Sequence, residues 1–122
     1  MSPAGPSGIA AEPARDVSIV LTTVPDLDTG ERIVRQLVEE RLIACGNLVP
    51  GVASIYRWKG EVQHEGEVLV VMKTRSATLE RLFRRAGELH PYEVPELLSI
   101  PVGAGLPAYC EWVVEETSEV HA

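Results

Sequence analysis

A long predicted β-hairpin in the middle of the chain constrains the fold more than any other sequence feature. Residues 48–58 and 67–74 alternate apolar with polar side chains and are rich in β-branched residues, which is typical of strands. Turn-forming residues separate the two arms at 59–61 and near Gly66, so the arms are expected to pair. The Pro50-Gly51 pair interrupts the first arm and predicts a bulge or bend, because proline lacks a backbone donor for the ladder.

A hairpin of this length also extends beyond the surface that a pair of helices can cover in a small domain. Tyr56 and Trp58 share one face of it, because side chains alternate along a strand. Large aromatic side chains on an uncovered strand favour burial against a second surface. We therefore expect Tyr56 and Trp58 to lie in an interface with another subunit.

Patterns typical of strands and helices surround the hairpin in a characteristic order. An apolar, β-branched stretch and an amphipathic stretch precede it, and a second amphipathic stretch, another strand and a third helix follow it. The expected elements are a strand over 17–24, a helix over 28–42, a helix that Ser76 or Thr78 caps and that continues to 89, a strand over 97–102 and a helix from 107 onward. This order predicts an α+β fold, a ferredoxin-like βαββαβ sandwich with a long β-hairpin and an extra C-terminal helix.

Composition predicts a single domain and excludes several classes of partner. The 122 residues suffice for one hydrophobic core, which we expect over residues 16–118, with a disordered N-terminal tail over 1–15 and a short C-terminal tail over 119–122. The formal net charge of −7 gives no general attraction to nucleic acid or to an anionic membrane. No apolar run suits a secretory signal or a membrane span, so a cytoplasmic location is expected.

The segment over residues 90–96 is the strongest candidate for a site. Its seven residues hold an imidazole, a phenol, two carboxylates and two prolines. Each proline fixes its own φ and restricts the residue before it, so the polar side chains are held in place as a binding site requires. The alternative is that a proline-rich elbow simply ends one helix and leads into the next strand.

Four segments match a known family in the same order along the chain. They are residues 44–51 after the first helix, 54–60 and 67–74 on the hairpin, and 90–97. On these segments the chain resembles the divalent-cation tolerance protein family, CutA, from about Val17 to Trp112. The resemblance implies a tight homotrimer whose sheets pack edge to edge through the long hairpins. It also implies a shape shared with the PII-type signalling proteins, which hold small ligands in clefts between subunits.

The resemblance further implies a metal ligand at His90. Family members are described as binding Cu(II) or another divalent cation, and His90 matches the histidine before their Pro-Tyr pair. Imidazole is a good ligand for such ions, but a lone imidazole binds weakly. Some members carry a second histidine directly before it and a cysteine on the first strand, where this chain has Leu89 and Thr22. Glu93, Glu96 or neighbouring subunits would then complete the site; alternatively, His90 only caps the helix that it ends.

Other side chains that match the family pattern are candidates for a cleft between subunits. Glu67 and Lys73 are six residues apart on one predicted strand and therefore share a face. If that face is covered, Lys73 needs a nearby carboxylate, because an unpaired buried ammonium is costly; otherwise both are solvated edge charges. Cys45 is either a core or interface thiol or a ligand for copper(I). The hypothesis is an inter-subunit cleft, beside His90, formed by Cys45, Glu67, Lys73, Tyr92, Glu93 and Glu96.

Two functions fit these expectations. The first is that of a cytoplasmic homotrimer of divalent metal ion (copper) tolerance, which binds divalent cations weakly. The second is that of a PII-like signalling module, which binds a small metabolite in an inter-subunit cleft and reports it to a protein partner. An enzyme is the least favoured reading, because the sequence holds no nucleophile elbow, phosphate loop or paired-carboxylate motif.

Overall fold

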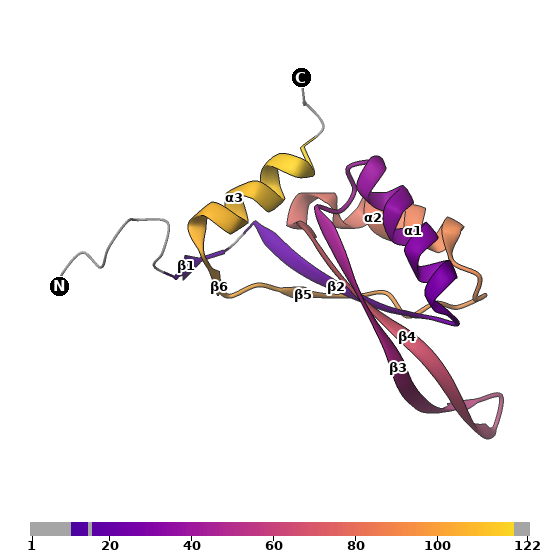
Figure 1. Cartoon of the computed structure of the whole chain (residues 1–122). Helices are drawn as coiled ribbons and strands as arrows, with labels where there is room; N and C mark the ends of the chain where they lie inside the picture. Colours follow the sequence, from indigo (N-terminus) through magenta and orange to yellow (C-terminus); the bar gives the residue numbers. More distant parts are fainter. Residues whose placement is uncertain (1–10, 15, 119–122) are drawn as a thin grey trace.

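Two helices cover one face of a four-stranded antiparallel sheet in this protein (Figure 1). The computed structural model describes residues 11–14 and 16–118. Six elements make the sandwich: β2 (Val17–Val24), α1 (Leu27–Glu39), β3 (Cys45–Trp58), β4 (Glu61–Arg75), α2 (Leu79–Leu89) and β5 (Leu98–Pro101). The strand order β3-β4-β2-β5 with antiparallel neighbours confirms the predicted ferredoxin-like arrangement.

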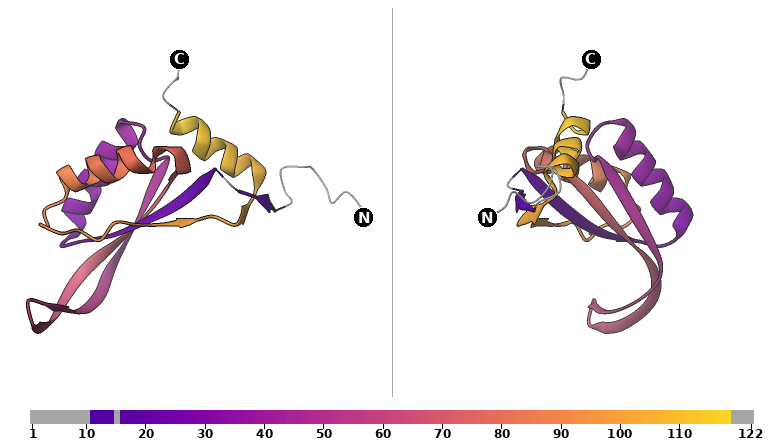
Figure 2. Two further views of the ribbon diagram at one scale, coloured as in Figure 1. Left: turned by 180° about the vertical axis from the view of Figure 1, so that it is seen from behind. Right: turned by 60° about the vertical axis from the view of Figure 1, so that its left-hand side comes forward.

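The β3–β4 hairpin projects beyond the helical layer, and its arms bend as they leave the sheet (Figures 1 and 2). The register shifts at Pro50-Gly51, so the predicted bulge is confirmed; Gly51 has a φ of 78°, which glycine adopts without strain. Lys59 and Gly60 both have positive φ and form the expected tight turn. The predicted second arm was too short, because residues 61–66 pair with β3 and extend the ladder through Gly66.

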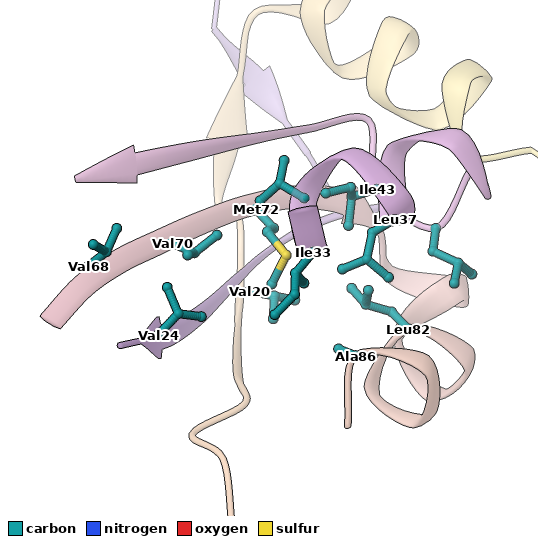
Figure 3. Close-up of a cluster of buried hydrophobic side chains, with 12 residues drawn as sticks. Val20, Val24, Ile33, Leu37, Ile43, Val68, Val70, Met72, Leu82 and Ala86 are labelled. Carbon is teal, nitrogen blue, oxygen red and sulfur yellow. The ribbon is translucent and has the colours of Figure 1, made fainter. Parts of the chain in front are cut away.

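The main core lies between the sheet and helices α1 and α2 (Figure 3). Alternate residues of β2 and β4 face the helices, as the period of a strand requires, and Val20 and Met72 are fully buried. Leu37 of α1 and Leu82 of α2 meet them from the helical side, also with no exposed surface. Burial of such a side chain stabilises the fold by about 1.5–3 kcal/mol, so this cluster holds the two layers together.

Helix α1 ends earlier than the periodicity predicts, whereas α2 follows Thr78, one of its two expected caps. Asp26 is the N-cap of α1, and its carboxylate accepts a hydrogen bond of 2.8 Å from the backbone N–H of Thr29. The helix ends at Glu39 rather than at residue 42, because Arg41 adopts a φ of 61° and turns the chain toward β3. Before α2, residues Ser76–Thr78 form a separate 3₁₀ turn.

A smaller cluster joins the third helix, α3 (Pro107–Glu116), to the end of the sheet. The short strand β1 (Glu12–Pro13) pairs with β6 (Ala104–Gly105), and Ala14 is buried in this cluster. Residues 12–14 were expected to belong to a disordered tail; the backbone pairing and the apolar contact of Ala14 order them instead. The remaining residues of the two expected tails, 1–10, 15 and 119–122, lie outside the described residues.

Candidate functional site

A groove of about 680 Å³ lies where the hairpin passes the end of β2 and the segment that follows α2. Val68 and Val70 of β4 face the helices, so Glu65 and Glu67, which alternate with them, face the opposite side of the sheet. Two glutamates of the segment after α2, Glu93 and Glu96, line the groove with them. Its aromatic lining comes from Tyr56, Trp58 and Tyr92.

A hydrogen bond between Tyr92 and Glu67 fixes the segment after α2 to the hairpin. The Tyr92 hydroxyl donates to a carboxylate oxygen of Glu67 at 2.6 Å. Burial, followed by this hydrogen bond, raises the pKa of the Tyr92 phenol above its ordinary value. Farther out on the hairpin, the Tyr56 hydroxyl donates to Glu65, and that hydrogen bond raises the pKa of Tyr56. Both phenols therefore stay protonated at neutral pH and act as donors.

The imidazole of His90 lies behind Tyr92, with the two ring centroids 4.8 Å apart. Its Nε2 is 2.8 Å from the carbonyl oxygen of Thr23, and its Nδ1 accepts a hydrogen bond of 3.1 Å from the Tyr92 backbone N–H. The carbonyl can only accept, so Nε2 carries the proton and the ring is neutral. Burial, the main cause, lowers the pKa of His90 below its ordinary value. His90 thus anchors the proline-rich segment to β2.

These contacts limit what His90 can offer a metal ion. A metal requires a lone pair on one ring nitrogen, and the structure uses both nitrogens for hydrogen bonds to the backbone. Over residues 11–14 and 16–118, no three histidine, cysteine, aspartate or glutamate side chains are grouped to hold a metal. Metal binding at His90 stays a prediction, and it requires that the Nδ1 hydrogen bond be given up and that other ligands be recruited.

The structure separates the predicted cleft residues into two groups. Glu67, Tyr92, Glu93 and Glu96 come together in the groove, beside Tyr56 and Trp58. Lys73 instead pairs with Cys45 about 20 Å farther along β4, since it is six positions from Glu67 on the strand.

That second group reaches α3 through Cys45. The Lys73 ammonium donates to the Asn47 side chain, and Cys45 Sγ is 3.5 Å from the hydroxyl oxygen of Tyr109. The Cys45 contact raises the pKa of Tyr109 to about 12. Within one chain, Cys45 and Lys73 therefore do not lie in the groove with the other predicted cleft residues.

Sequence reasoning missed three polar residues of the groove lining. Thr23 is the last residue but one of β2, while Ser54 and Glu65 form a cross-strand pair of the hairpin. Alternation from Glu67 could have found Glu65, because residues two apart on a strand share a face. The turn expected near Gly66 concealed that pattern, because the predicted strand began at Glu67 and left Glu65 outside it.

The fold and this groove define a ferredoxin-like protein whose hairpin reaches beyond its helical layer. Residues 18–116 match the family described as CutA1 divalent ion tolerance protein. The divalent-cation tolerance protein CutA of Thermus thermophilus is 46% identical over 99 residues, which cover 81% of this chain and 96% of that protein. The structure of CutA from Synechococcus elongatus matches with a TM-score of 0.88 at 29% identity, over 93% of this chain and 100% of that one. The chain therefore belongs to the CutA1 divalent ion tolerance family, as its sequence motifs predicted.

Relatives differ in length and in the location that their names state. The chain covers only 54% of the length of the chloroplastic CutA protein of Arabidopsis thaliana, which is 39% identical over 99 residues. A structure from Archaeoglobus fulgidus, 29% identical with a TM-score of 0.81, is called the periplasmic divalent cation tolerance protein CutA. Within the described ranges, no helix is long and apolar enough to cross a bilayer. The predicted cytoplasmic location stays a prediction.

Proposed function

We propose that this protein is a cytoplasmic, non-catalytic subunit of a homotrimer that contributes to divalent-cation tolerance, with the groove as a weak cation site shared between copies. The proposal rests on the exposure of two aromatic side chains that line the groove. Tyr56 and Trp58 keep 39% and 43% of their surface exposed on a hairpin that the chain's own helices do not cover. Aromatic side chains of this size favour a partner surface.

The uncovered face of the sheet supports assembly in the same way. Leu98 and Ile100 of β5 are 58% and 48% exposed, and Val49 of β3 is 44% exposed. By strand pairing these residues lie on the side away from α1 and α2, where Leu69 and Val71 are also only partly buried. An apolar sheet face of this kind marks an interaction surface, and a second copy with the same face is its occupant in this proposal.

The donor set of the groove fits a weak cation site better than a tight one. Carboxylates bind hard divalent ions, whereas copper and zinc prefer imidazole or thiolate ligands. Glu67 and Glu96 supply such oxygens, and His90 is the imidazole beside them. Because His90 must lose a hydrogen bond to bind, Cu(II) would be held weakly by one chain and more tightly where a second copy adds ligands.

A calorimetric titration of Cu(II) into chelator-stripped protein tests this assignment. We expect weak, saturable binding that is reduced in both His90→Ala and Glu67→Gln. His64→Ala is the matched control, because His64 is an exposed hairpin residue that does not line the groove. Absence of binding, or binding that neither groove variant changes, would contradict the metal assignment; light scattering on the same samples tests the trimer.

The dimensions of the groove favour a second candidate, a PII-like site for a small metabolite. Its volume of about 680 Å³ lies within the range of about 300–1,000 Å³ that is typical of small-molecule sites. A ligand at a hundredfold excess over its dissociation constant would stabilise the protein by about 2.7 kcal/mol. Thermal melts across a metabolite panel test this candidate, and a panel without any shift would count against it.

A further inference from the structure

The groove carries four carboxylates and, within the described part of the chain, no lysine, arginine or histidine in its lining. One of the four, Glu67, is only 8% exposed, and the group that donates to it is the neutral phenol of Tyr92. A buried carboxylate without a cation beside it is costly, whereas a cationic ligand would offset that cost. The charge of the groove therefore excludes an anion and favours a positive ligand.

Aromatic rings give the groove a second means of recognising a cation. Tyr56, Trp58 and Tyr92 line the same groove as the glutamates. The faces of such rings attract ammonium groups, and the indole ring of tryptophan attracts them most strongly. Trp58 already has an ammonium nearby, because Nζ of Lys59 is 5.8 Å from its ring centroid. Aromatic and carboxylate groups together are the chemistry that recognises an organic ammonium ion.

The size and apolar lining of the groove distinguish an organic cation from a metal ion. A bare divalent ion occupies a small part of 680 Å³ and gains nothing from apolar walls. Ile55 and Val94 line the groove and are 70% and 67% exposed. An aliphatic stem placed against them would remove apolar surface from water, at about 25 cal/mol per Å² buried.

We propose that the groove binds an aliphatic polyamine, an organic cation in which methylene chains join two or more ammonium groups. The inference rests on the proposed function of the groove as a ligand site and names the chemical class of its ligand. The ammonium groups pair with Glu67 and with the more exposed Glu93 and Glu96, while the methylene chains lie against Trp58 and Val94. Several carboxylates around one groove match several positive charges on one ligand.

The test is a calorimetric titration of spermidine into the full, chelator-stripped chain at physiological ionic strength. Glu67→Gln keeps the shape of the side chain and an oxygen that accepts from Tyr92, but it removes the charge. Glu96→Gln makes the same change at an exposed position, which avoids any effect on folding. Glu31→Gln is the control, because exposed Glu31 lies on α1 outside the groove and the net charge changes equally.

We expect saturable binding of spermidine that weakens by about tenfold or more in Glu67→Gln and also weakens in Glu96→Gln, but not in Glu31→Gln. Trp58 and Trp112 are the two tryptophans of the chain, so a fluorescence change that persists in Trp112→Phe assigns the signal to the groove. Absence of saturable binding, or equal weakening in Glu31→Gln, would overturn the proposal. Equally tight binding of Mg²⁺ would also overturn it, because the groove would then respond to charge alone.

The same protein samples separate this inference from the proposed function. If Cu(II) binding depends on Glu67 while spermidine does not bind, the polyamine assignment fails and the cation site stands. If spermidine binds through Glu67 while Cu(II) does not bind, the groove is a ligand site and the metal assignment fails. If neither ligand binds, both proposals fall.

Discussion

Removal of the Tyr92 hydroxyl is the most direct perturbation of the groove. Tyr92→Phe deletes the donor of the 2.6 Å hydrogen bond to Glu67, whose side chain is only 8% exposed. Hydrogen bonds to charged groups contribute about 1.5–3 kcal/mol, and little solvent can replace the lost donor at this depth. We therefore expect Tyr92→Phe to lower the free energy of unfolding by about 1.5–3 kcal/mol.

Urea unfolding at one fixed protein concentration measures this loss, since the proposed assembly would make stability depend on concentration. A double-mutant cycle with Glu67→Gln isolates the contribution of the charge. In the Glu67→Gln background the acceptor is a neutral amide, so the same tyrosine substitution should cost only about 0.5–1.5 kcal/mol. The coupling between Tyr92 and Glu67 is the difference between these two losses.

Tyr109→Phe is a matched control for the loss of a phenol hydroxyl. Tyr109 contacts the weakly polar Cys45 thiol at 3.5 Å and belongs to α3, outside the groove lining. Sulfur is a weak hydrogen-bond partner, so the control should cost about 0.5 kcal/mol or less. If Tyr92→Phe costs no more than Tyr109→Phe, or if its effect simply adds to that of Glu67→Gln, the reasoning about a buried charged acceptor is refuted.

Three further predictions concern the core, the histidine and the hairpin. Leu37→Ala should lower the free energy of unfolding by about 2–5 kcal/mol, because Leu37 is fully buried; a loss below about 1 kcal/mol in urea would contradict this packing. Burial lowers the pKa of His90 below 6.5, so the unfolded chain binds the additional proton. The free energy of unfolding should thus have its full value above about pH 6.5 and decrease as the pH falls. If the free energy of unfolding of His90→Gln, measured by urea melts, changes with pH in the same way, other groups cause that dependence. Trp58→Ala should weaken the proposed homotrimer on dilution, whereas an unchanged mass by light scattering would place Trp58 outside the interface.

Periodic patterns made the order of the elements predictable from the sequence. The element boundaries that were predicted wrongly depend on the backbone conformation of single residues. The alternation of β3 and β4 and the Pro50-Gly51 interruption revealed the hairpin and its bulge, because each depends on local geometry. The end of α1 depends on Arg41 in the left-handed region, a conformation that its residue type does not favour. Pairing of β1 with β6 joins residues about ninety positions apart, which no local pattern encodes.

The site was predictable only where its residues are close together in the chain. The proline-rich segment pointed to Tyr92, Glu93 and Glu96, and all three line one groove of the chain. The bond from Tyr92 to Glu67 joins positions 25 apart, and only the resemblance to the family linked them. Lys73 was placed with Glu67 because both face the same side of β4, but a shared face does not bring the two ends of a long strand together.

The two departures from the family pattern both lie on the core side of the structure rather than in the groove. Thr22 is 2% exposed and alternates with Thr23, which lines the groove, so a thiol in its place would face the helices. Its buried hydroxyl has no hydrogen-bond partner among the described residues. Leu89 is partly buried against the main core, whereas the next residue, His90, carries the bonds to Thr23 and Tyr92. Neither departure therefore removes a side chain from the groove, and in the proposed cation site the carboxylates of the groove are the ligands that select the cation.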